Sequence, residues 1–377
     1  KDLKYPAWPA VVPPELKETG SLMKLITEKD RFVHVPYQTF DYVVRLLQEA
    51  AVSKGVKSIK ITLYRLAKHS KIVEALICAA RNGKKVTAVV ELLARFDESS
   101  NISYSRQMQD AGVNVVFGPE GLKIHSKIID ITLRNGTDIC VVGTGNFHEG
   151  NARVYTDYFM MTANPTIEKE VDRVFDIIRR PFRLQTFDHL LVSPFNMRER
   201  FLELIDDEIR AARKGKPAWI KIKINHVTDE EMVAKLYEAS AAGVKIDMLV
   251  RGNCSLVTTE PGIGENIQIA GIIDRYLEHS RIFIFHAGGE NKTFIGSADW
   301  MPRNLDRRIE VVTPVYDPDM KADLMRTVEY GLRDNVNASV VDGTGRNELR
   351  VIPGEKLPFR SQEELYDAYS GNDKPGE

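Results

Sequence analysis

Short apolar runs alternate with helical periods along most of the chain. Apolar residues fill consecutive positions where a buried strand is expected and recur every three or four positions where a helix is expected. This pattern predicts a helix that begins with 41–47, helices over 72–82 and 104–111, and strands over 59–64, 86–93, 113–117, 128–133 and 139–143. Further helices are predicted over 167–179 and 199–214. The alternation is typical of an α/β sandwich with a mostly parallel sheet.

Prolines divide the chain into segments. Four of them within the first fourteen residues are incompatible with a helix or a central strand there, so residues 1–30 are predicted to form an extended arm. Pro181 and Pro194 bracket a connecting segment. We therefore expect two domains, over 31–190 and 191–355, followed by a C-terminal helix or tail over 356–377. The chain begins at Lys1 rather than at a methionine, which indicates processing or a fragment of a longer protein.

The second half of the sequence repeats the first. Five features recur in the same order, at offsets that drift only from 161 to 153: Lys60–Leu63 with Lys221–Ile224, Gly83 with Gly243, Ile124–Lys127 with Glu278–Arg281, Gly143–Asn146 with Gly296–Asp299, and Tyr155–Asp157 with Arg308–Glu310. Chance matches would not keep both order and spacing. The sequence therefore predicts a tandem duplication of one α/β unit.

The duplicated features carry residues suited to phosphate chemistry. His125 and Lys127 are two positions apart on a predicted strand, so both side chains point to the same face. A glycine-rich loop follows and ends at Asn146, which supplies an amide. A neutral imidazole beside a cation can attack phosphorus while the cation holds its oxygens. A single histidine is more often structural, but the recurrence at His279 and Arg281 favours a site.

Composition narrows the choice of partner. The chain has 52 Lys and Arg against 53 Asp and Glu, a net charge of −1, which excludes the basic overall field of many nucleic-acid-binding proteins. No nucleic acid is expected, and a polyanion would need a local group of cations.

Cys78, Cys140 and Cys254 are too few for a disulfide framework or a zinc knuckle, and each is predicted to be buried. We expect a cytoplasmic protein without a membrane span; peripheral membrane association stays open.

The paired motifs resemble the two half-sites of the phospholipase D superfamily, in which two histidines meet across a pseudo-twofold axis. Hydrolases of that superfamily have Asp seven residues after each histidine, whereas this chain has Thr132 and His286. From about Phe32 to Arg350 the chain closely resembles the bacterial polyphosphate kinase family with the phospholipase D-like core. The strings that carry this resemblance are Ile61–Arg65, Glu91–Asp97, Gly121–His125, Tyr155–Tyr158, Leu249–Gly252, Tyr276–His279 and Ser297–Met301.

This resemblance implies a fold and an activity. The fold is two tandem phospholipase D-like α/β sandwich domains related by pseudo-twofold duplication, preceded in the family by two further domains. The activity is reversible transfer of the terminal phosphate of ATP to inorganic polyphosphate through a phosphohistidine, with Mg²⁺ as cofactor and ATP, ADP and polyphosphate as partners. We also expect a homo-oligomer, and little activity from this part alone because the nucleotide pocket extends into the upstream domains.

The resemblance also implies residue roles. His125 matches the phosphohistidine nucleophile, with Lys127 beside it, and His279 matches a second histidine that contacts the nucleotide and handles protons. Arg65 and Arg95 match a magnesium and phosphate site; because a guanidinium cannot ligate a cation, we interpret them as clamps on phosphate oxygens that the metal shares. The full expected set that binds ATP or phosphate is Tyr155, Arg251, His279, Arg65, Arg95, Arg281 and Asn146.

Some alternatives remain open. Asp157 and Glu310 could orient the two histidines or be structural, and Asp97 with Glu98 could hold a metal, although a solvated turn is favoured. A phosphodiesterase could use the same histidine pair, and its activity on a phosphodiester without ATP would reveal it. A non-enzymatic polyanion-binding module would keep its binding after mutation of both histidines, with a steep salt dependence.

Overall fold

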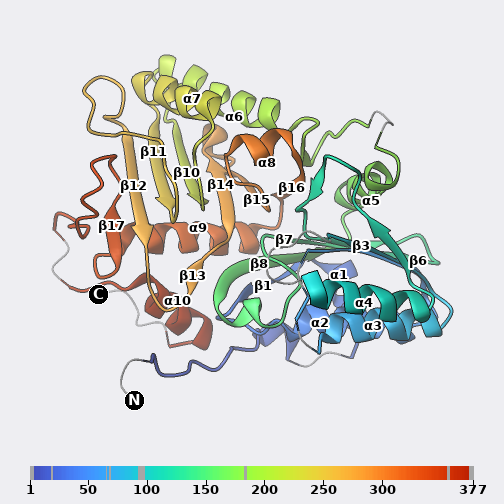
Figure 1. Cartoon of the computed structure of the whole chain (residues 1–377). Helices are drawn as coiled ribbons and strands as arrows, with labels where there is room; N and C mark the ends of the chain where they lie inside the picture. The colour runs from blue at the N-terminus through green and yellow to red at the C-terminus, as the bar shows by residue number, and fades with distance from the viewer. Residues whose placement is uncertain are drawn as a thin grey trace.

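The computed structural model describes residues 4–17, 20–64, 66–67, 69–91, 98–181, 185–354 and 357–372, without the side chains of 98–101. These residues form two β-sheets, one from each half of the chain, and helices pack against both sheets (Figure 1). The two sheets meet at a seam where α-helices and strands of both halves contact one another.

The first sheet has the order β1-β8-β7-β6-β2-β3-β4. Its strands are β1 (Arg31–Val35), β2 (Val56–Leu63), β3 (Lys85–Val90), β4 (Asn114–Phe117), β6 (Ile128–Leu133), β7 (Ile139–Gly143) and β8 (Tyr155–Thr162). The helices of this half are α1 (Leu22–Glu28), α2 (Asp41–Val52), α3 (Lys71–Arg81), α4 (Glu98–Asp110) and α5 (Pro165–Arg179). Local signals set their ends: the Ser70 hydroxyl caps α3 by accepting from the Val73 amide, and Gly83 follows the helix at φ +78°.

The second sheet has the order β17-β12-β11-β10-β14-β15-β16, and β9 pairs with β16. Its strands are β9 (Leu191–Ser193), β10 (Trp219–Ile224), β11 (Lys245–Val250), β12 (Ile267–Ile272), β14 (Arg281–Phe285), β15 (Lys292–Gly296), β16 (Arg308–Val315) and β17 (Ala338–Val340). The helices are α6 (Met197–Arg213), α7 (Glu230–Ala241), α8 (Pro302–Asp306), α9 (Pro318–Arg333) and α10 (Ser361–Ser370). When the second sheet is read from β9 to β12, its order β9-β16-β15-β14-β10-β11-β12 matches the first sheet from β1 to β4 strand for strand. This match confirms the duplication.

Several expectations about local structure were wrong. The sheets are mixed rather than mostly parallel: β2, β3 and β4 run parallel, but β6, β7, β8 and β1 each pair antiparallel with their neighbours. Residues 1–30 are not extended throughout, because a 3₁₀ turn at Pro14–Leu16 and helix α1 pack Leu16 and Ile26 into the first core. Helix α4 begins at Glu98, earlier than expected, and Cys78 is exposed on α3.

Two very short strands cross the seam in opposite directions. β5 (Lys123–Ile124) pairs with β16 of the second half, and β13 (Leu277–Glu278) pairs with β8 of the first half. Each strand therefore leaves the half that encodes it and joins the other sheet. His125 follows β5 and His279 follows β13, so both histidines are carried to the seam.

Apolar packing from helices α5 and α9 holds the seam together. On α5, Val171 and Val174 are fully buried in a cluster that includes Val311 of β16. On α9, Leu324 is buried in a cluster that includes Met160 of β8. A fully buried aliphatic side chain contributes roughly 1.5–3 kcal/mol, so such clusters fix the relative position of the two sheets.

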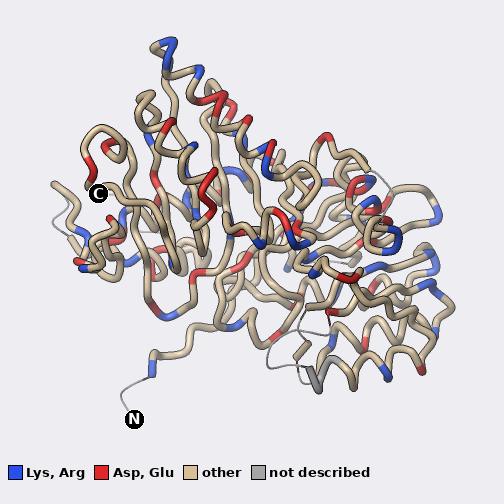
Figure 2. Tube along the Cα trace, turned by 45° about the horizontal axis from the view of Figure 1, so that its top comes forward, with Lys and Arg blue, Asp and Glu red and all other residues tan. Residues whose placement is uncertain are grey.

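Charge is spread over the chain. Figure 2 shows Lys and Arg interspersed with Asp and Glu along the trace, in keeping with the near-zero net charge. Among the described residues, no helix combines the length and the apolar character that a membrane crossing requires.

Candidate active site at the seam

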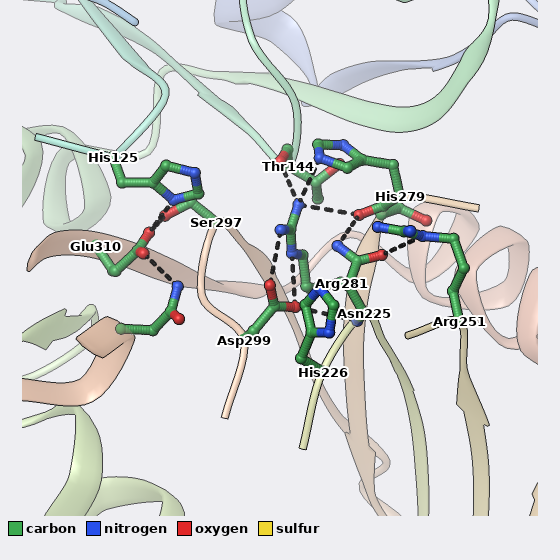
Figure 3. Close-up of polar contacts among 12 residues, drawn as sticks. His125, Thr144, Asn225, His226, Arg251, His279, Arg281, Ser297, Asp299 and Glu310 are labelled. Carbon is green, nitrogen blue, oxygen red and sulfur yellow. Dashed lines mark hydrogen bonds and ion pairs between the residues drawn. The ribbon is translucent and has the colours of Figure 1, made fainter. Parts of the chain in front are cut away.

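His125 is oriented by a carboxylate from the opposite half of the chain. Its backbone N–H donates to the Ile309 carbonyl at 3.0 Å, and its Nδ1 lies 2.9 Å from Oε2 of Glu310 on β16 (Figure 3). The Glu310 carboxylate also accepts hydrogen bonds from the Ser297 hydroxyl and, at 2.7 Å, from Asn304 Nδ2. Three donors thus converge on one buried carboxylate.

His279 has the reciprocal arrangement. Its Nδ1 lies 2.8 Å from Oδ2 of Asp157, which belongs to β8 of the first half. The Thr144 hydroxyl donates to the same carboxylate at 2.6 Å, as Ser297 does to Glu310. Asp157 and Glu310, left open from the sequence, thus each contact a histidine across the seam.

These contacts determine which ring nitrogen of each histidine is available. Burial raises the pKa of Glu310 to about 7, with Lys127 opposing the shift, whereas the pKa of Asp157 is lowered. An ionised carboxylate accepts, so with Asp157 and Glu310 ionised each Nδ1 carries the proton and each Nε2 keeps its lone pair. The side chains of His125 and His279 are 13% and 15% exposed, so each keeps an open edge. Burial, reinforced by Lys127, lowers the pKa of His125 well below its usual value. Burial also lowers the pKa of His279, although Asp157 opposes the shift. Both imidazoles are therefore neutral near pH 7.

The cations beside the two histidines differ. Arg281 is 3% exposed, and its Nε and Nη2 each lie 3.1 Å from an oxygen of Asp299. Burial would raise the pKa of Asp299, but Arg281 outweighs it and lowers that pKa to about 2. A third nitrogen, Nη1 of Arg281, lies 3.2 Å from Nε2 of His279. Arg281 thus holds the second imidazole in place.

Within the part of the chain that the structure describes, Lys127 lacks the paired carboxylate that Arg281 has in Asp299. Asn146 occupies the repeat position of Asp299, so an amide replaces the carboxylate that pairs with Arg281. Lys127 is 2% exposed, and its ammonium donates to the His125 carbonyl. Burial lowers its pKa to about 7, with Glu310 opposing the shift. Among the described residues, the buried Oδ1 of Asn146 has no hydrogen-bond partner.

Tyr155 and Arg251 line a cavity of about 540 Å³ next to His279, together with Ile273 and Glu278. The Tyr155 ring lies 5.2 Å from the His279 ring, centroid to centroid. Arg251 Nε donates to the Glu278 carbonyl at 2.7 Å. The volume is in the range of small-molecule sites.

Arg65 and Arg95, both predicted to bind phosphate, and Asp97 lie outside the described residues. Glu98 forms the start of α4.

The residues near the histidines fit phosphate better than a metal held by protein. Among the described residues, no group of three or more His, Cys, Asp or Glu side chains could hold a metal ion. Asp157, Asp299 and Glu310 already accept hydrogen bonds from histidine or arginine. The groups beside the histidines that can still donate, Lys127, Arg281 and the Asn146 amide, suit phosphate oxygens, and the engaged carboxylates offer no cage for Mg²⁺.

Sequence reasoning missed part of the site. Asn225 donates from Nδ2 to the His279 carbonyl at 3.1 Å, and the Asp299 carboxylate accepts from the Asn225 backbone. His226 follows directly, with its Nδ1 accepting from the Asn253 amide at 2.9 Å. The repeat offers a signal for this pair, because Asn225 and His226 follow β10 as Tyr64 and Arg65 follow β2, at the offset of 161.

Comparison with known proteins identifies the family. The protein-family model of polyphosphate kinase C-terminal domain 1 matches residues 21–184, and the family model of C-terminal domain 2 matches residues 190–362. The chain belongs to the polyphosphate kinase family. The polyphosphate kinase of Salmonella typhimurium is 45% identical over 354 residues, covering 93% of this chain and 51% of the relative. That of Vibrio parahaemolyticus is 47% identical over 345 residues, covering 91% and 49%.

Solved structures agree on the fold. The polyphosphate kinase of Porphyromonas gingivalis superimposes with a TM-score of 0.91 at 41% identity, covering 98% of this chain and 57% of that one. The phosphatidylserine synthase of Haemophilus influenzae has a TM-score of 0.57 at 10% identity, over 92% of this chain and 94% of that one, which shows a shared fold alone. The fold is two tandem phospholipase D-like domains. The chain spans about half the length of the polyphosphate kinases it matches.

Proposed function

We propose that this chain is the catalytic part of an enzyme that reversibly transfers the terminal phosphate of ATP to inorganic polyphosphate. One observation carries the proposal: the Glu310 carboxylate holds Nδ1 of His125, so Nε2 is left as a nucleophile at the seam. Membership of the polyphosphate kinase family supports the choice of substrates.

The first half-reaction forms a phosphohistidine. The lone pair on Nε2 of His125 attacks the terminal phosphorus of ATP, a P–N bond forms, and the bond to the bridging oxygen breaks. ADP leaves with that oxygen and its electron pair. The phosphorylated ring keeps its Nδ1 proton and so carries a positive charge, which the Glu310 carboxylate at 2.9 Å stabilises.

The second half-reaction releases the phosphate to the acceptor. A terminal oxygen of polyphosphate attacks the phosphorus, the P–N bond breaks, and Nε2 recovers its lone pair. A protonated terminal phosphate is a poor nucleophile, so a base near it assists. We assign this role to His279, whose Nε2 accepts from Arg281 until the substrate displaces that contact. Both steps conserve a high-energy phosphate bond, so the reaction can run either way.

Cations stabilise the charge that develops on the transferring phosphoryl group. Lys127, whose ammonium donates to the His125 carbonyl, is proposed to supply one such charge, and the cavity lined by Tyr155 and Arg251 is proposed to hold the nucleotide. From its sequence position, Asn146 is proposed to donate its amide to a phosphate oxygen. From their sequence positions, Arg65 and Arg95 are proposed as further phosphate clamps. Arg281 stays paired with Asp299 through Nε and Nη2, and once the substrate displaces its contact with Nε2 of His279, Nη1 is proposed to donate to a phosphate oxygen.

Mg²⁺ is proposed to enter with ATP, bound to its phosphate oxygens, because the described carboxylates are engaged elsewhere. There it would supply charge neutralisation.

Phosphohistidine labelling of the full-length enzyme tests the proposal. Incubation with ATP labelled in the terminal phosphate should give an acid-labile, base-stable label that His125→Ala abolishes. His279→Ala should remove turnover while His125 can still take up label, although slowly. Uptake of the same label by His125→Ala would reject His125 as nucleophile, and hydrolysis of a chromogenic phosphodiester without ATP would favour a phosphodiesterase.

A further inference from the structure

The strand that carries His279 has little backbone support of its own. β13 consists of two residues, Leu277 and Glu278, paired with Tyr155 and Thr156 of β8. Strands of globular proteins usually have about five or six residues, so two residues form few ladder hydrogen bonds. The position of His279 therefore depends on contacts made by side chains around β13.

A glutamine from the C-terminal helix makes some of those contacts, in addition to those of Arg251 with the Glu278 carbonyl and of Asn225 with the His279 carbonyl. Gln362 on α10 is fully buried, and its side-chain amide is satisfied on both sides. Its Oε1 accepts from the Tyr276 amide at 2.9 Å, and its Nε2 donates to the Tyr276 carbonyl at 2.9 Å. Gln362 thus acts as one more strand residue, pairing with the backbone just before β13.

The same amide reaches the His279 backbone through Glu278. Gln362 Nε2 also donates to Oε1 of Glu278 at 2.8 Å, and the other oxygen of Glu278 lies 2.9 Å from Lys223 Nζ. That oxygen accepts from the Thr156 hydroxyl at 3.1 Å, and the Thr156 hydroxyl accepts from the His279 amide at 3.2 Å. A continuous set of hydrogen bonds therefore links α10 to His279.

Helix α10 is itself firmly anchored. The Ser361 amide and hydroxyl both donate to Oδ2 of Asp334, at 2.8 and 2.7 Å. Tyr366 stacks on Trp8 with the ring centroids 4.7 Å apart, and Tyr369 donates to Asp323 at 2.7 Å. A fixed helix can hold β13 in one position. In the first half, the strand before His125 is held differently, by Glu91, which accepts from the Ile124 amide at 3.1 Å.

We propose that Gln362 is a positioning residue for the phosphotransfer reaction: it fixes Glu278 and β13 and thereby sets the location of the His279 imidazole. The proposal rests on the proposed function only in so far as His279 acts in that reaction. It gives the C-terminal helix a part in the reaction, although no residue of α10 contacts either histidine ring through the hydrogen bonds of the described structure.

The test compares two variants of the full-length enzyme. Gln362→Met keeps the size of the side chain and removes all three hydrogen bonds. Ser361→Ala is the matched control, because it removes a buried hydrogen bond of the same helix without touching β13. The decisive measurement is the rate at which diethyl pyrocarbonate acylates His279, mapped by mass spectrometry, with His125 as the internal reference. Steady-state synthesis of polyphosphate from ATP is measured alongside.

For Gln362→Met we expect the His279 acylation rate to change at least threefold relative to His125, and kcat to fall about 10- to 100-fold, because misplacement by about 1 Å can cost that much. Ser361→Ala should leave both within twofold while lowering the melting temperature. An unchanged His279 acylation rate in Gln362→Met, or an equal change in Ser361→Ala, overturns the proposal. If the unmutated enzyme makes no polyphosphate, the proposed function fails, but the acylation rates still decide the role of Gln362.

Discussion

Burial raises the pKa of Glu310 to about 7, so at pH 8 the carboxylate is mostly ionised beside His125. Replacing Glu310 with glutamine removes that negative charge with almost no change in shape. The carboxylate accepts from His125 on one oxygen, shared with Ser297, and from Asn304 on the other. An amide has one oxygen and one NH₂ group, so it can satisfy only one of these two sides. If the oxygen faces Asn304, the NH₂ group faces Nδ1 of His125 and forces the proton to Nε2, which removes the nucleophilic lone pair.

The other orientation is less damaging. With its oxygen facing His125, the new amide needs Asn304 to turn its own amide, and Oδ1 of Asn304 is otherwise buried without a partner among the described residues. The tautomer is then kept, but the charge that stabilises the phosphorylated ring is lost. A hydrogen bond to a charged group contributes about 2 kcal/mol, equivalent to about 30-fold in rate. A wrong tautomer in a comparable triad costs about 10⁴-fold. We therefore expect a loss between these limits.

The assay is the rate of His125 phosphorylation in a single turnover, followed by rapid quenching of the full-length enzyme with labelled ATP. Glu208→Gln is the matched control, because Glu208 is a buried glutamate of the second half that accepts from the backbone of Trp219 and Ala287, away from the histidines. The control should lower the melting temperature and leave the rate of phosphorylation within twofold. A Glu310→Gln rate within threefold of the unmutated enzyme would refute the role given to this carboxylate.

Two further substitutions test the seam. Gly145→Ala would place a Cβ atom 2.0 Å from Oδ2 of Asp157, so we expect a displaced carboxylate and at least a tenfold loss of turnover; turnover within threefold would contradict this geometry. Asp299 has a pKa near 3.8 when unfolded and about 2 when folded, so its pair with Arg281 adds about 2 kcal/mol of stability that is present above pH 4 and lost as pH falls from 4 to 2. The melting temperature of Asp299→Asn should therefore approach that of the unmutated protein on acidification, and a constant difference between pH 6 and 3 would argue against the pair.

Much of the fold could be predicted because its signals are local. Apolar periods located α2 and α3, and the repeated spacing of motifs revealed the duplication that the strand orders confirm. Strand direction was predicted wrongly, because periodicity reports burial and carries no information on whether a neighbour runs parallel. The two-residue strands β5 and β13 are too short to leave a periodic signal, so their exchange between the sheets could not be foreseen.

The same limit applies to the site. The repeat marked His125, His279, Asp157 and Glu310 as equivalent positions, but only the crossing strands pair each histidine with the carboxylate of the other half. Gln362 lies 83 residues beyond His279 in the sequence and resembles any other helical glutamine until α10 is placed against β13. Contacts between distant segments, rather than the chemistry of single residues, were what the sequence did not reveal.

The position of the phosphate on the histidine ring shows whether Nε2 of His125 is the nucleophile. Nuclear magnetic resonance of the phosphorylated full-length enzyme, labelled with ¹⁵N in histidine, distinguishes phosphate on Nε2 from phosphate on Nδ1. Since Nδ1 of His125 is held by Glu310, we expect phosphate on Nε2 of His125, with the Nδ1 proton retained. Phosphate on Nδ1 of His125, or on His279, would contradict this expectation.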